Sequence, residues 1–183
     1  MGCGLCPLAR AAIEMTRNSV TIAPLTTTDE PLLCEMMFQA IFVPDGAEAP
    51  PRTIVDEPTM RKYFSAFGTI AGDIGYKALA GERGKAIGAA WLRLLQGEQQ
   101  GYGYVDDATP ELSIAVDPAH RGRGVGTLLL EALFAAAAEE YTAISLSVWP
   151  ENPAYRLYQR LGFVVVKQEM GDPAVTMIKH LYV

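Results

Sequence analysis

The segment that most constrains the fold of this chain is residues 111–127, with the sequence Glu-Leu-Ser-Ile-Ala-Val-Asp-Pro-Ala-His-Arg-Gly-Arg-Gly-Val-Gly-Thr. It begins with a short, largely apolar run that is typical of a buried strand and stops at Asp117-Pro118. A loop with three glycines and two arginines follows, and a helix with one apolar face is predicted over 124–141. A strand, a glycine-rich loop and a helix in direct succession are typical of an α/β domain.

The loop in this segment has the composition of a phosphate-binding site. After a strand, such a loop directs backbone N–H groups and a helix N-terminus at one point, and its small residues let a ligand approach the backbone. The Walker pattern does not fit, because no lysine follows a glycine in the loop. The dinucleotide fingerprint G-x-G-x-x-G would need glycine at position 127 or 129, which hold Thr and Leu. The sequence therefore predicts phosphate binding by a different motif.

The remaining pattern of apolar residues predicts an α/β domain with a mixed sheet. Expected strands cover 20–25, 76–80, 86–95, 111–116, 143–148, 163–168 and 175–181. Expected helices cover 28–42, 59–67, 124–141 and 152–161. The turn-like Gly81-Glu82-Arg83-Gly84 joins two of the strands into a hairpin, and residues 96–110 are expected to form a long polar loop.

The composition of the chain excludes several classes of protein without naming a function. Half of the 183 residues are hydrophobic, which is enough for the core of one ordinary domain. The net charge of −6 disfavours nucleic-acid binding, because phosphate neutralisation needs a basic face. No stretch reaches the roughly 18 apolar residues needed to cross a bilayer, so no membrane partner is expected.

The cysteines and the N-terminus give further expectations. Three cysteines are an odd, sparse set that does not make a disulfide framework, which favours a reducing, cytoplasmic compartment. Cys3 and Cys6 form a lone C-x-x-C with no second pair, so no metal site is expected. Residues 1–14 do not fit a signal peptide and are expected to lie outside a single domain over 15–183, with Met15 a candidate for the true start.

Two motifs carry a resemblance to a known family. The loop reads R-x-x-G-x-G from Arg121 to Gly126, which resembles the acyl-CoA-binding motif of the GCN5-related N-acetyltransferase (GNAT) superfamily. Residues 147–163 resemble the next motif of that family, in which an Asn opens a helix, a Tyr lies in mid-helix and Gly-Phe begins a strand. The two motifs have the right order and spacing. The resemblance implies a GNAT-like α/β fold, with a central mixed, mostly antiparallel sheet of about seven strands flanked by about four helices.

The resemblance also implies that the chain uses acetyl-CoA as co-substrate. The strand predicted at 111–116 looks like the fourth strand of this family. In the family the fourth and fifth strands splay apart, the acyl-pantetheine inserts between them, and backbone groups of the fourth strand polarise the thioester carbonyl. The loop would bind the pyrophosphate, while Asn152 would contact the cofactor, cap its helix, or do both. The residues expected to contact the cofactor are Ile114, Ala115, Val116, Arg121, Gly122, Arg123, Gly124, Val125, Gly126, Thr127, Asn152 and Tyr155.

Two side chains are expected to move protons if the resemblance holds. Tyr158 matches the family tyrosine that faces the CoA sulfur and gives a proton to the leaving thiolate; the alternative is a core aromatic. Glu111 lies where many family members place a glutamate that deprotonates the amine, often through water; the alternative is a solvent-facing carboxylate at a strand end. Asp106 and Asp107 in the preceding loop are further candidates for the base.

The resulting prediction is an N-acetyltransferase that moves an acetyl group from acetyl-CoA to a primary amine of a small molecule or peptide. Direct transfer in a ternary complex is expected, because none of the cysteines lies in a motif that indicates a catalytic nucleophile. A catalytically silent acyl-CoA-binding or sensory module of the same fold is the alternative, and a nucleotide-binding protein is a third class. The aromatic and acidic loop at 96–110 suits a cationic amine. A homodimer is compatible with the resemblance.

Overall fold

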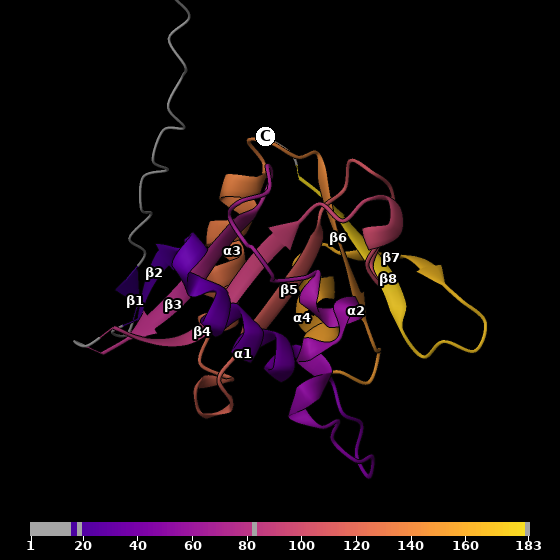
Figure 1. Ribbon diagram of the computed structural model, residues 1–183, viewed down its shortest axis with the longest axis horizontal. Coiled ribbons are helices and arrows are strands. Elements are labelled where there is room, and N and C mark those ends of the chain that lie inside the picture. The colour runs from indigo at the N-terminus through magenta and orange to yellow at the C-terminus, as the bar shows by residue number, and fades with distance from the viewer. Residues whose placement is uncertain (1–15, 18–19, 82–83, 182–183) are drawn as a thin grey trace, which may run out of the picture.

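The computed structural model of the protein describes residues 16–17, 20–81 and 84–181, which share one twisted sheet (Figure 1). Within those residues the sheet has eight strands in the spatial order β1-β2-β3-β4-β5-β6-β8-β7. The strands are β1 Thr16–Arg17, β2 Val20–Pro24, β3 Ile74–Ala80, β4 Lys85–Arg93, β5 Glu111–Val116, β6 Ala143–Val148, β7 Val164–Gln168 and β8 Val175–His180.

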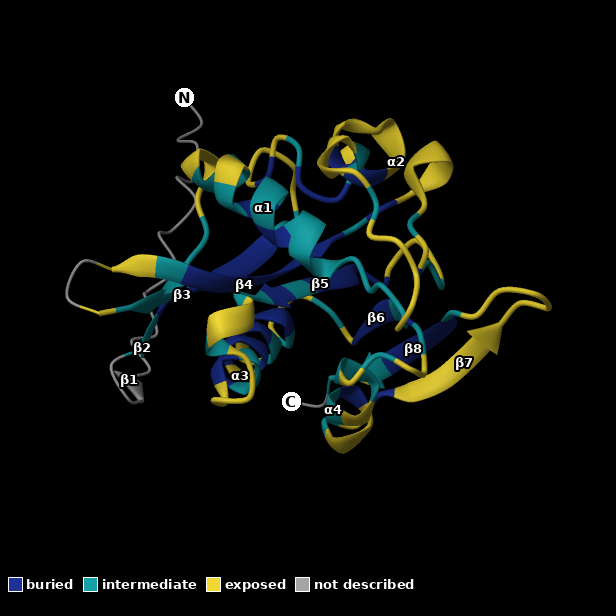
Figure 2. Ribbon diagram, turned by 90° about the horizontal axis from the view of Figure 1, so that it is seen from below, coloured by how far each residue is buried: buried dark blue, intermediate teal, exposed yellow. Residues whose placement is uncertain are grey.

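Among the described residues, four α-helices cover the two faces of the sheet, with α1 and α2 on one face and α3 and α4 on the other (Figure 2). Their bounds are α1 Glu30–Ala40, α2 Pro58–Arg61, α3 Val125–Ala137 and α4 Ala154–Arg160. Short 3-10 helices are η1 Thr27–Asp29, η2 Arg52–Asp56, η3 Gly97–Gln99 and η4 Pro118–His120. Each face has its own hydrophobic cluster: Leu129 and Leu133 of α3 are fully buried on one side, and Leu33 of α1 packs with Trp91 on the other.

The pairing of the strands confirms the prediction of a mixed, mostly antiparallel sheet. Every neighbouring pair is antiparallel except β5 and β6, which are parallel. A parallel pair needs a crossover connection, and the helix α3 supplies it between β5 and β6. The predicted hairpin is β3 and β4, and the two-residue β1 is the strand that the sequence pattern did not predict.

The predicted second helix over 59–67 is wrong in its extent, because α2 ends at Arg61 and irregular turns follow it. Two features outside the local sequence explain this. Ala66 has φ +54°, in the left-handed region where an α-helix cannot continue. The indole Nε1 of Trp91 donates to the Tyr63 carbonyl oxygen at 2.8 Å, so a core tryptophan satisfies a backbone group of this segment.

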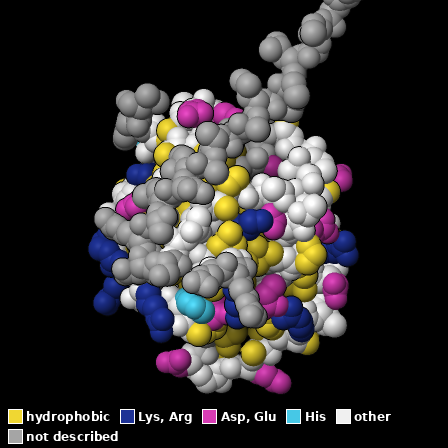
Figure 3. Space-filling view, turned by 90° about the vertical axis from the view of Figure 1, so that its left-hand side faces the viewer, with side chains coloured by type: hydrophobic (Ala, Val, Ile, Leu, Met, Phe, Trp, Pro, Cys, Tyr) yellow, Lys and Arg dark blue, Asp and Glu magenta, His cyan; other side chains and the backbone are white. Residues whose placement is uncertain are grey.

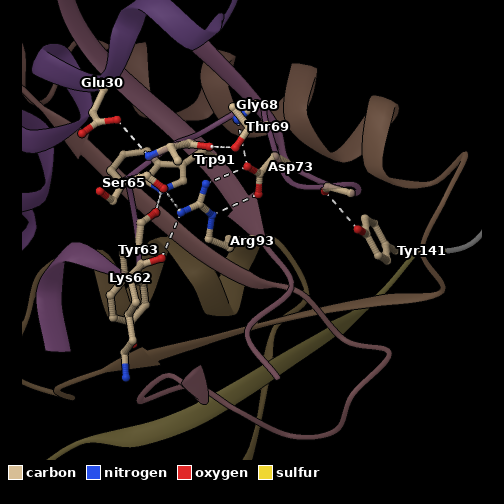
Figure 4. A network of polar contacts seen from close by, with 12 residues as sticks. Glu30, Lys62, Tyr63, Ser65, Gly68, Thr69, Asp73, Trp91, Arg93 and Tyr141 are labelled. Atoms are coloured by element: carbon tan, nitrogen blue, oxygen red, sulfur yellow. Dashed lines mark hydrogen bonds and ion pairs between the residues drawn. The ribbon is translucent and has the colours of Figure 1, made fainter. Parts of the chain in front are cut away.

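The same segment is fastened by Arg93, which is only 2% exposed (Figure 4). Its guanidinium pairs in bidentate fashion with Asp73, through Nε to Oδ1 at 3.0 Å and Nη2 to Oδ2 at 2.7 Å. Its Nη1 donates to the carbonyl oxygens of Lys62 at 3.0 Å and Ser65 at 2.7 Å. A buried ion pair with these extra hydrogen bonds costs much to break, so it holds the turns after α2 against β4.

Some predictions concern residues outside the described part of the chain. They are the N-terminal segment 1–14, the start at Met15, and the turn residues Glu82 and Arg83. In the described part, no helix has the length and apolar character needed to span a membrane. Figure 3 shows acidic and basic side chains interspersed over the face at the β1–β2 end of the sheet.

Candidate active site

The site is built around the place where the ladder between β5 and β6 stops. Both strands have six residues, yet in this described part of the sheet they share one register pair, Glu111 with Ser145. The Ser145 amide donates to the carbonyl oxygen of Pro110 at 3.0 Å, just before that pair. On its other edge β5 stays paired with β4 along its whole length, as far as Val116. The backbone of β5 after Glu111 is therefore not paired with β6.

The direction of the backbone groups along β5 follows from the alternation of a strand. The Asp117 amide donates to Ile87 of β4 at 2.8 Å, so the amide of Ala115, two residues earlier, also faces β4. The amides of Ile114 and Val116 face the opposite way, toward the gap beside β6. Of the three β5 residues expected to pair with a ligand, Ile114 and Val116 have the backbone direction that such pairing needs.

The glycine-rich loop after β5 takes a shape that its sequence requires. Gly122 and Gly124 have φ +72° and +81°, in the left-handed region that favours glycine. Gly124 is the N-cap of α3 and supplies no side-chain cap, so the first amide groups of α3 have no hydrogen bond inside the helix. These amides, at Val125, Gly126 and Thr127, are the donors that a phosphate group can use.

The two arginines of the loop have different surroundings. The Nε of Arg121 donates to the Val116 carbonyl oxygen at 2.8 Å, and its Nη2 donates to the Gln39 carbonyl oxygen at 3.4 Å. Arg121 therefore ties the loop to the end of β5 and to α1. Arg123 is exposed on the same loop and adds a positive charge there.

Gly126 brings three elements of the candidate site together. A Cβ atom at this position would lie 3.9 Å from side-chain carbons of both Ile114 and Val116, and 4.0 Å from one of Leu157 in α4. The start of α3, the end of β5 and the side of α4 thus meet at the loop. The two remaining residues predicted to contact the ligand lie on or just before α4. Asn152 accepts a hydrogen bond at Oδ1 from the Ala154 amide at 2.9 Å, while Pro153 is the N-cap of the helix. Tyr155 is half-buried.

Tyr158 lies in α4 and is 8% exposed. Its ring packs edge-on against Phe163, with 5.6 Å between the ring centres, in the hydrophobic cluster that α3 forms with the sheet. Burial raises the pKa of the Tyr158 phenol above its usual range. The side chain is therefore a protonated hydroxyl at neutral pH, and it is held on a rigid helix.

Glu111 is buried, contrary to the alternative of a solvent-facing carboxylate, with 5% of its surface exposed. Its Oε1 accepts two hydrogen bonds, from the Gly103 amide at 2.8 Å and from the Tyr63 hydroxyl at 3.1 Å. Its Oε2 is buried and has no hydrogen-bond partner among the described residues. Burial raises the pKa of Glu111 to about 7, against the lowering effects of these two hydrogen bonds and of the Lys62 charge. A carboxyl group with this pKa can take up a proton near neutral pH.

Three residues in contact with Glu111 lie outside the sequence motifs that indicated the site. Gly101 and Gly103 lie so close to Glu111 that a Cβ atom would stand 1.9 Å from Oε2 or 2.9 Å from Oε1, respectively. Tyr63, which lies in the segment predicted as a helix over 59–67, directs its hydroxyl at the carboxylate. The alternation Gly-Tyr-Gly-Tyr at 101–104 was the one local signal of this contact.

The other candidates for a base, Asp106 and Asp107, are exposed, and both form hydrogen bonds within their own loop. Asp106 accepts a hydrogen bond from the Ala108 amide, and Asp107 accepts one from the Tyr104 hydroxyl, each at 2.9 Å. Neither has the buried, partly unpaired carboxylate of Glu111. Within the described residues, no group of three His, Cys, Asp or Glu side chains is placed to hold a metal ion.

A polar hollow of about 230 Å³ is lined in part by Gly101, which also lies against the Glu111 carboxyl group. The loop residues Gly101 and Tyr102 line one side, Ser147 of β6 contributes to the lining, and residues of β7, of β8 and of the turn between them line the rest. Charges of both signs line it, including Glu169, which forms an ion pair with Lys167 at 2.7 Å. The hollow and the Glu111 carboxyl group therefore have Gly101 as a common neighbour.

The sequence matches the model of one known protein family. The model of the acetyltransferase (GNAT) family matches residues 43–163, more than half of the chain. No curated protein matches the sequence.

Solved structures show the same fold at low sequence identity. The GNAT domain of PAT from S. lividans has 21% identity and a TM-score of 0.62, and the match covers 88% of this chain and 90% of that one. A GCN5-related N-acetyltransferase from Kribbella flavida has 21% identity over 89% and 98% of the two chains, with a TM-score of 0.60. The ribosomal-protein-S18-alanine N-acetyltransferase from Escherichia coli has 21% identity over 90% and 95%, with a TM-score of 0.59.

Proposed function

Because the chain belongs to the acetyltransferase (GNAT) family, we propose that it transfers an acetyl group from acetyl-CoA to a primary amine of a small molecule or peptide. The transfer is direct, within a ternary complex. The observation that carries this proposal is the buried carboxyl group of Glu111, which lies where the β5–β6 ladder stops and has one unpaired oxygen. We assign the activity to residues 15–183 as one domain, and we place it in the cytoplasm because of the sparse cysteines.

The residues around the opening fit an acyl-CoA. The pyrophosphate is proposed to bind the amides of the loop from Arg121 to Thr127, with Arg123 as an added charge, while Asn152 and Tyr155 line the side formed by α4. The pantetheine is proposed to lie along β5, where the amides of Ile114 and Val116 face the gap, with Ala115 between them. When bound, acetyl-CoA supplies an acyl group that is activated as a thioester.

The proposed mechanism needs two proton movements by this chain. Glu111 accepts a proton from the ammonium group of the acceptor, directly or through one water molecule, since only the neutral amine is a nucleophile. Tyr158 holds a proton that it can give to the departing thiolate, and its raised pKa keeps it protonated until then. Side chains alternate along β5, so Glu111 lies on the sheet face of Ala115, opposite to the face of Leu112 and Tyr158. The reacting groups are therefore proposed to lie in the gap between β5 and β6, which adjoins both faces.

We expect Tyr158→Phe to lower turnover about tenfold to a hundredfold while the affinity for acetyl-CoA stays nearly unchanged. The hydroxyl would be lost without the ring, so the packing against Phe163 persists. Steady-state kinetics and calorimetric titration with acetyl-CoA measure the two quantities. Tyr141→Phe, which removes a tyrosine hydroxyl outside the proposed site, is the control and should leave both quantities unchanged. Unchanged turnover in Tyr158→Phe would remove Tyr158 from the mechanism.

The acceptor is proposed to be a cationic amine that enters the polar hollow beside Gly101. The exposed ring of Tyr102 and the nearby acidic side chains suit such a group. The E. coli enzyme named above is an N-acetyltransferase for an alanine of ribosomal protein S18. Peptides with a free N-terminus are therefore included among the acceptors to be tested. No nucleic acid or membrane is proposed as a partner, and a homodimer stays a prediction.

One experiment tests the proposed function against its alternative. The protein is mixed with acetyl-CoA and a panel of polyamines, aminoglycosides, amino acids, and lysine or N-terminal peptides, and the release of free thiol is followed. We expect thiol release with at least one amine class and none without an amine. Tight binding of acetyl-CoA with no turnover on any amine would favour a catalytically silent acyl-CoA-binding module. Thermal stabilisation by ATP or NAD, but not by CoA, would favour a nucleotide-binding protein.

A further inference from the structure

The two oxygens of the Glu111 carboxyl group have unequal surroundings. Oε1 accepts hydrogen bonds from the Gly103 amide and the Tyr63 hydroxyl, whereas the buried Oε2 accepts none from the described residues. An oxygen that already accepts two hydrogen bonds is the poorer site for an added proton, because the proton would displace a donor. The unpaired oxygen is the better one, and it abuts Gly101, which lines the polar hollow.

The direction of the Tyr63 hydroxyl is fixed by a second contact. The Tyr102 amide donates to the Tyr63 oxygen at 2.7 Å. Because the oxygen accepts from this side, the hydroxyl proton is directed at Glu111. The ring of Tyr63 stacks on that of Tyr102, with 6.4 Å between centres and 8° between planes. Lys62 extends over both rings and donates to the Gln100 carbonyl oxygen at 2.7 Å.

Tyr63 is itself held from behind by the core. Trp91 donates to the Tyr63 carbonyl oxygen, and Arg93 binds the carbonyl oxygens of Lys62 and Ser65 on either side (Figure 4). A hydroxyl that is fixed by packing and by a backbone donor keeps its geometry without reorganisation when the carboxyl group changes its charge. The position of Tyr63 is therefore set by the fold and not by the loop alone.

We infer that Tyr63 is a positioning residue: together with the Gly103 amide it donates a hydrogen bond to Oε1 of Glu111. Oε2 is thereby left as the atom that accepts the proton of the acceptor amine. This inference rests on the proposed function, in which Glu111 is the base. In the reaction one N–H bond of the ammonium group breaks and one O–H bond forms at Oε2. The hydrogen bond from Tyr63 stabilises the ionised carboxylate, so removing it makes the carboxylate a stronger base that is charged only at higher pH.

The test is the titration of Glu111 in the protein without any ligand, followed by NMR of its ¹³C-labelled carboxyl carbon. The resonance is assigned by its loss in Glu111→Gln. We expect Tyr63→Phe to raise the titration midpoint from about 7 by about one pH unit. Tyr141→Phe is the matched control, because it removes one tyrosine hydroxyl, bonded to the Gly72 carbonyl oxygen, on the far side of the Arg93 network. An unshifted midpoint in Tyr63→Phe overturns the inference.

Kinetics give a second readout of the same inference. In Tyr63→Phe we expect kcat/KM to fall about fivefold at pH 7 and to recover by pH 9, because the rise in the pKa of Glu111 is all that changes. A uniform loss at every pH would mark a merely structural role and would contradict the inference. If Glu111→Gln keeps full activity and an unchanged pH profile, it is the assignment of Glu111 as base that fails, whatever Tyr63→Phe shows in NMR.

Discussion

We expect Glu111→Gln to lower turnover by about 10²- to 10⁴-fold, while the affinity for acetyl-CoA stays nearly unchanged. The amide has the size of the carboxyl group, and its oxygen can keep the donors from Tyr63 and Gly103, but it cannot accept a proton at neutral pH. In the unaltered protein, turnover should rise with pH through about 7, as the base form of Glu111 becomes populated. Thiol release across a pH series measures both effects.

The same substitution should stabilise the fold at high pH. Burial raises the pKa of Glu111 from 4.5 to about 7, so between these values the unfolded chain binds fewer protons than the folded one. The stability of the unaltered protein therefore falls as pH rises through this window and stays low above it. Relative to the unaltered protein, Glu111→Gln should gain up to about 3 kcal/mol between pH 4.5 and pH 8. Urea unfolding at several pH values measures this gain.

A matched control is available on the surface. Glu131→Gln makes the same chemical change on the exposed side of α3 and should alter neither turnover nor the pH dependence of unfolding. If Glu111→Gln keeps its turnover, the base is another group, and Asp106→Asn and Asp107→Asn become the variants to measure. If turnover falls but the stability of Glu111→Gln follows the same pH dependence as that of the unaltered protein, the carboxyl group is not buried in the way described.

The second large effect is expected from Gly124→Val, which should weaken acetyl-CoA binding by about a hundredfold. The reason is conformational and not steric, because a Cβ atom at Gly124 would meet nothing within 4 Å. A β-branched residue does not adopt φ +81° without strain, so the loop would change shape and its amides would lose their common direction. Calorimetric titration with acetyl-CoA measures the loss.

Gly46 provides an unusually close control for this substitution. It has the same φ of +81° and, like Gly124, open space around a Cβ atom, but it lies in the loop after α1. Gly46→Val should therefore cost similar backbone strain and leave the affinity for acetyl-CoA unchanged. Equal loss of affinity in both variants would mean that general destabilisation, and not the shape of the loop after β5, explains the result.

Much of the fold followed from local patterns. The strands at 111–116 and 143–148 were predicted with the bounds that β5 and β6 have, because short apolar runs ended by turn residues are well marked in a sequence. The hairpin of β3 and β4 and the helices α1, α3 and α4 also lie where they were predicted, within a few residues at their ends. The family followed from two motifs, R-x-x-G-x-G and the segment around Asn152, and the family model confirms it.

The helix expected at 59–67 shows where local patterns failed. Its apolar spacing is helical, but the contacts that decide its shape come from Trp91 and Arg93, about thirty residues away. The spacing of apolar residues within a segment does not indicate hydrogen-bond partners that are distant in the chain. The same contacts place Tyr63 against Glu111, so the segment where the helix prediction failed is also the one that completes the candidate site.

The sequence by itself determined the order of the elements, the family, and the glycine-rich loop whose left-handed glycines no other residue type replaces without strain. Only the tertiary structure decided the state of Glu111. Its burial depends on the loop at 101–103 folding over the start of β5, and its two oxygens differ because Tyr63 and Gly103 reach only one of them. A carboxyl group acquires its pKa from neighbours that are distant in the chain, and the residue type alone does not specify them.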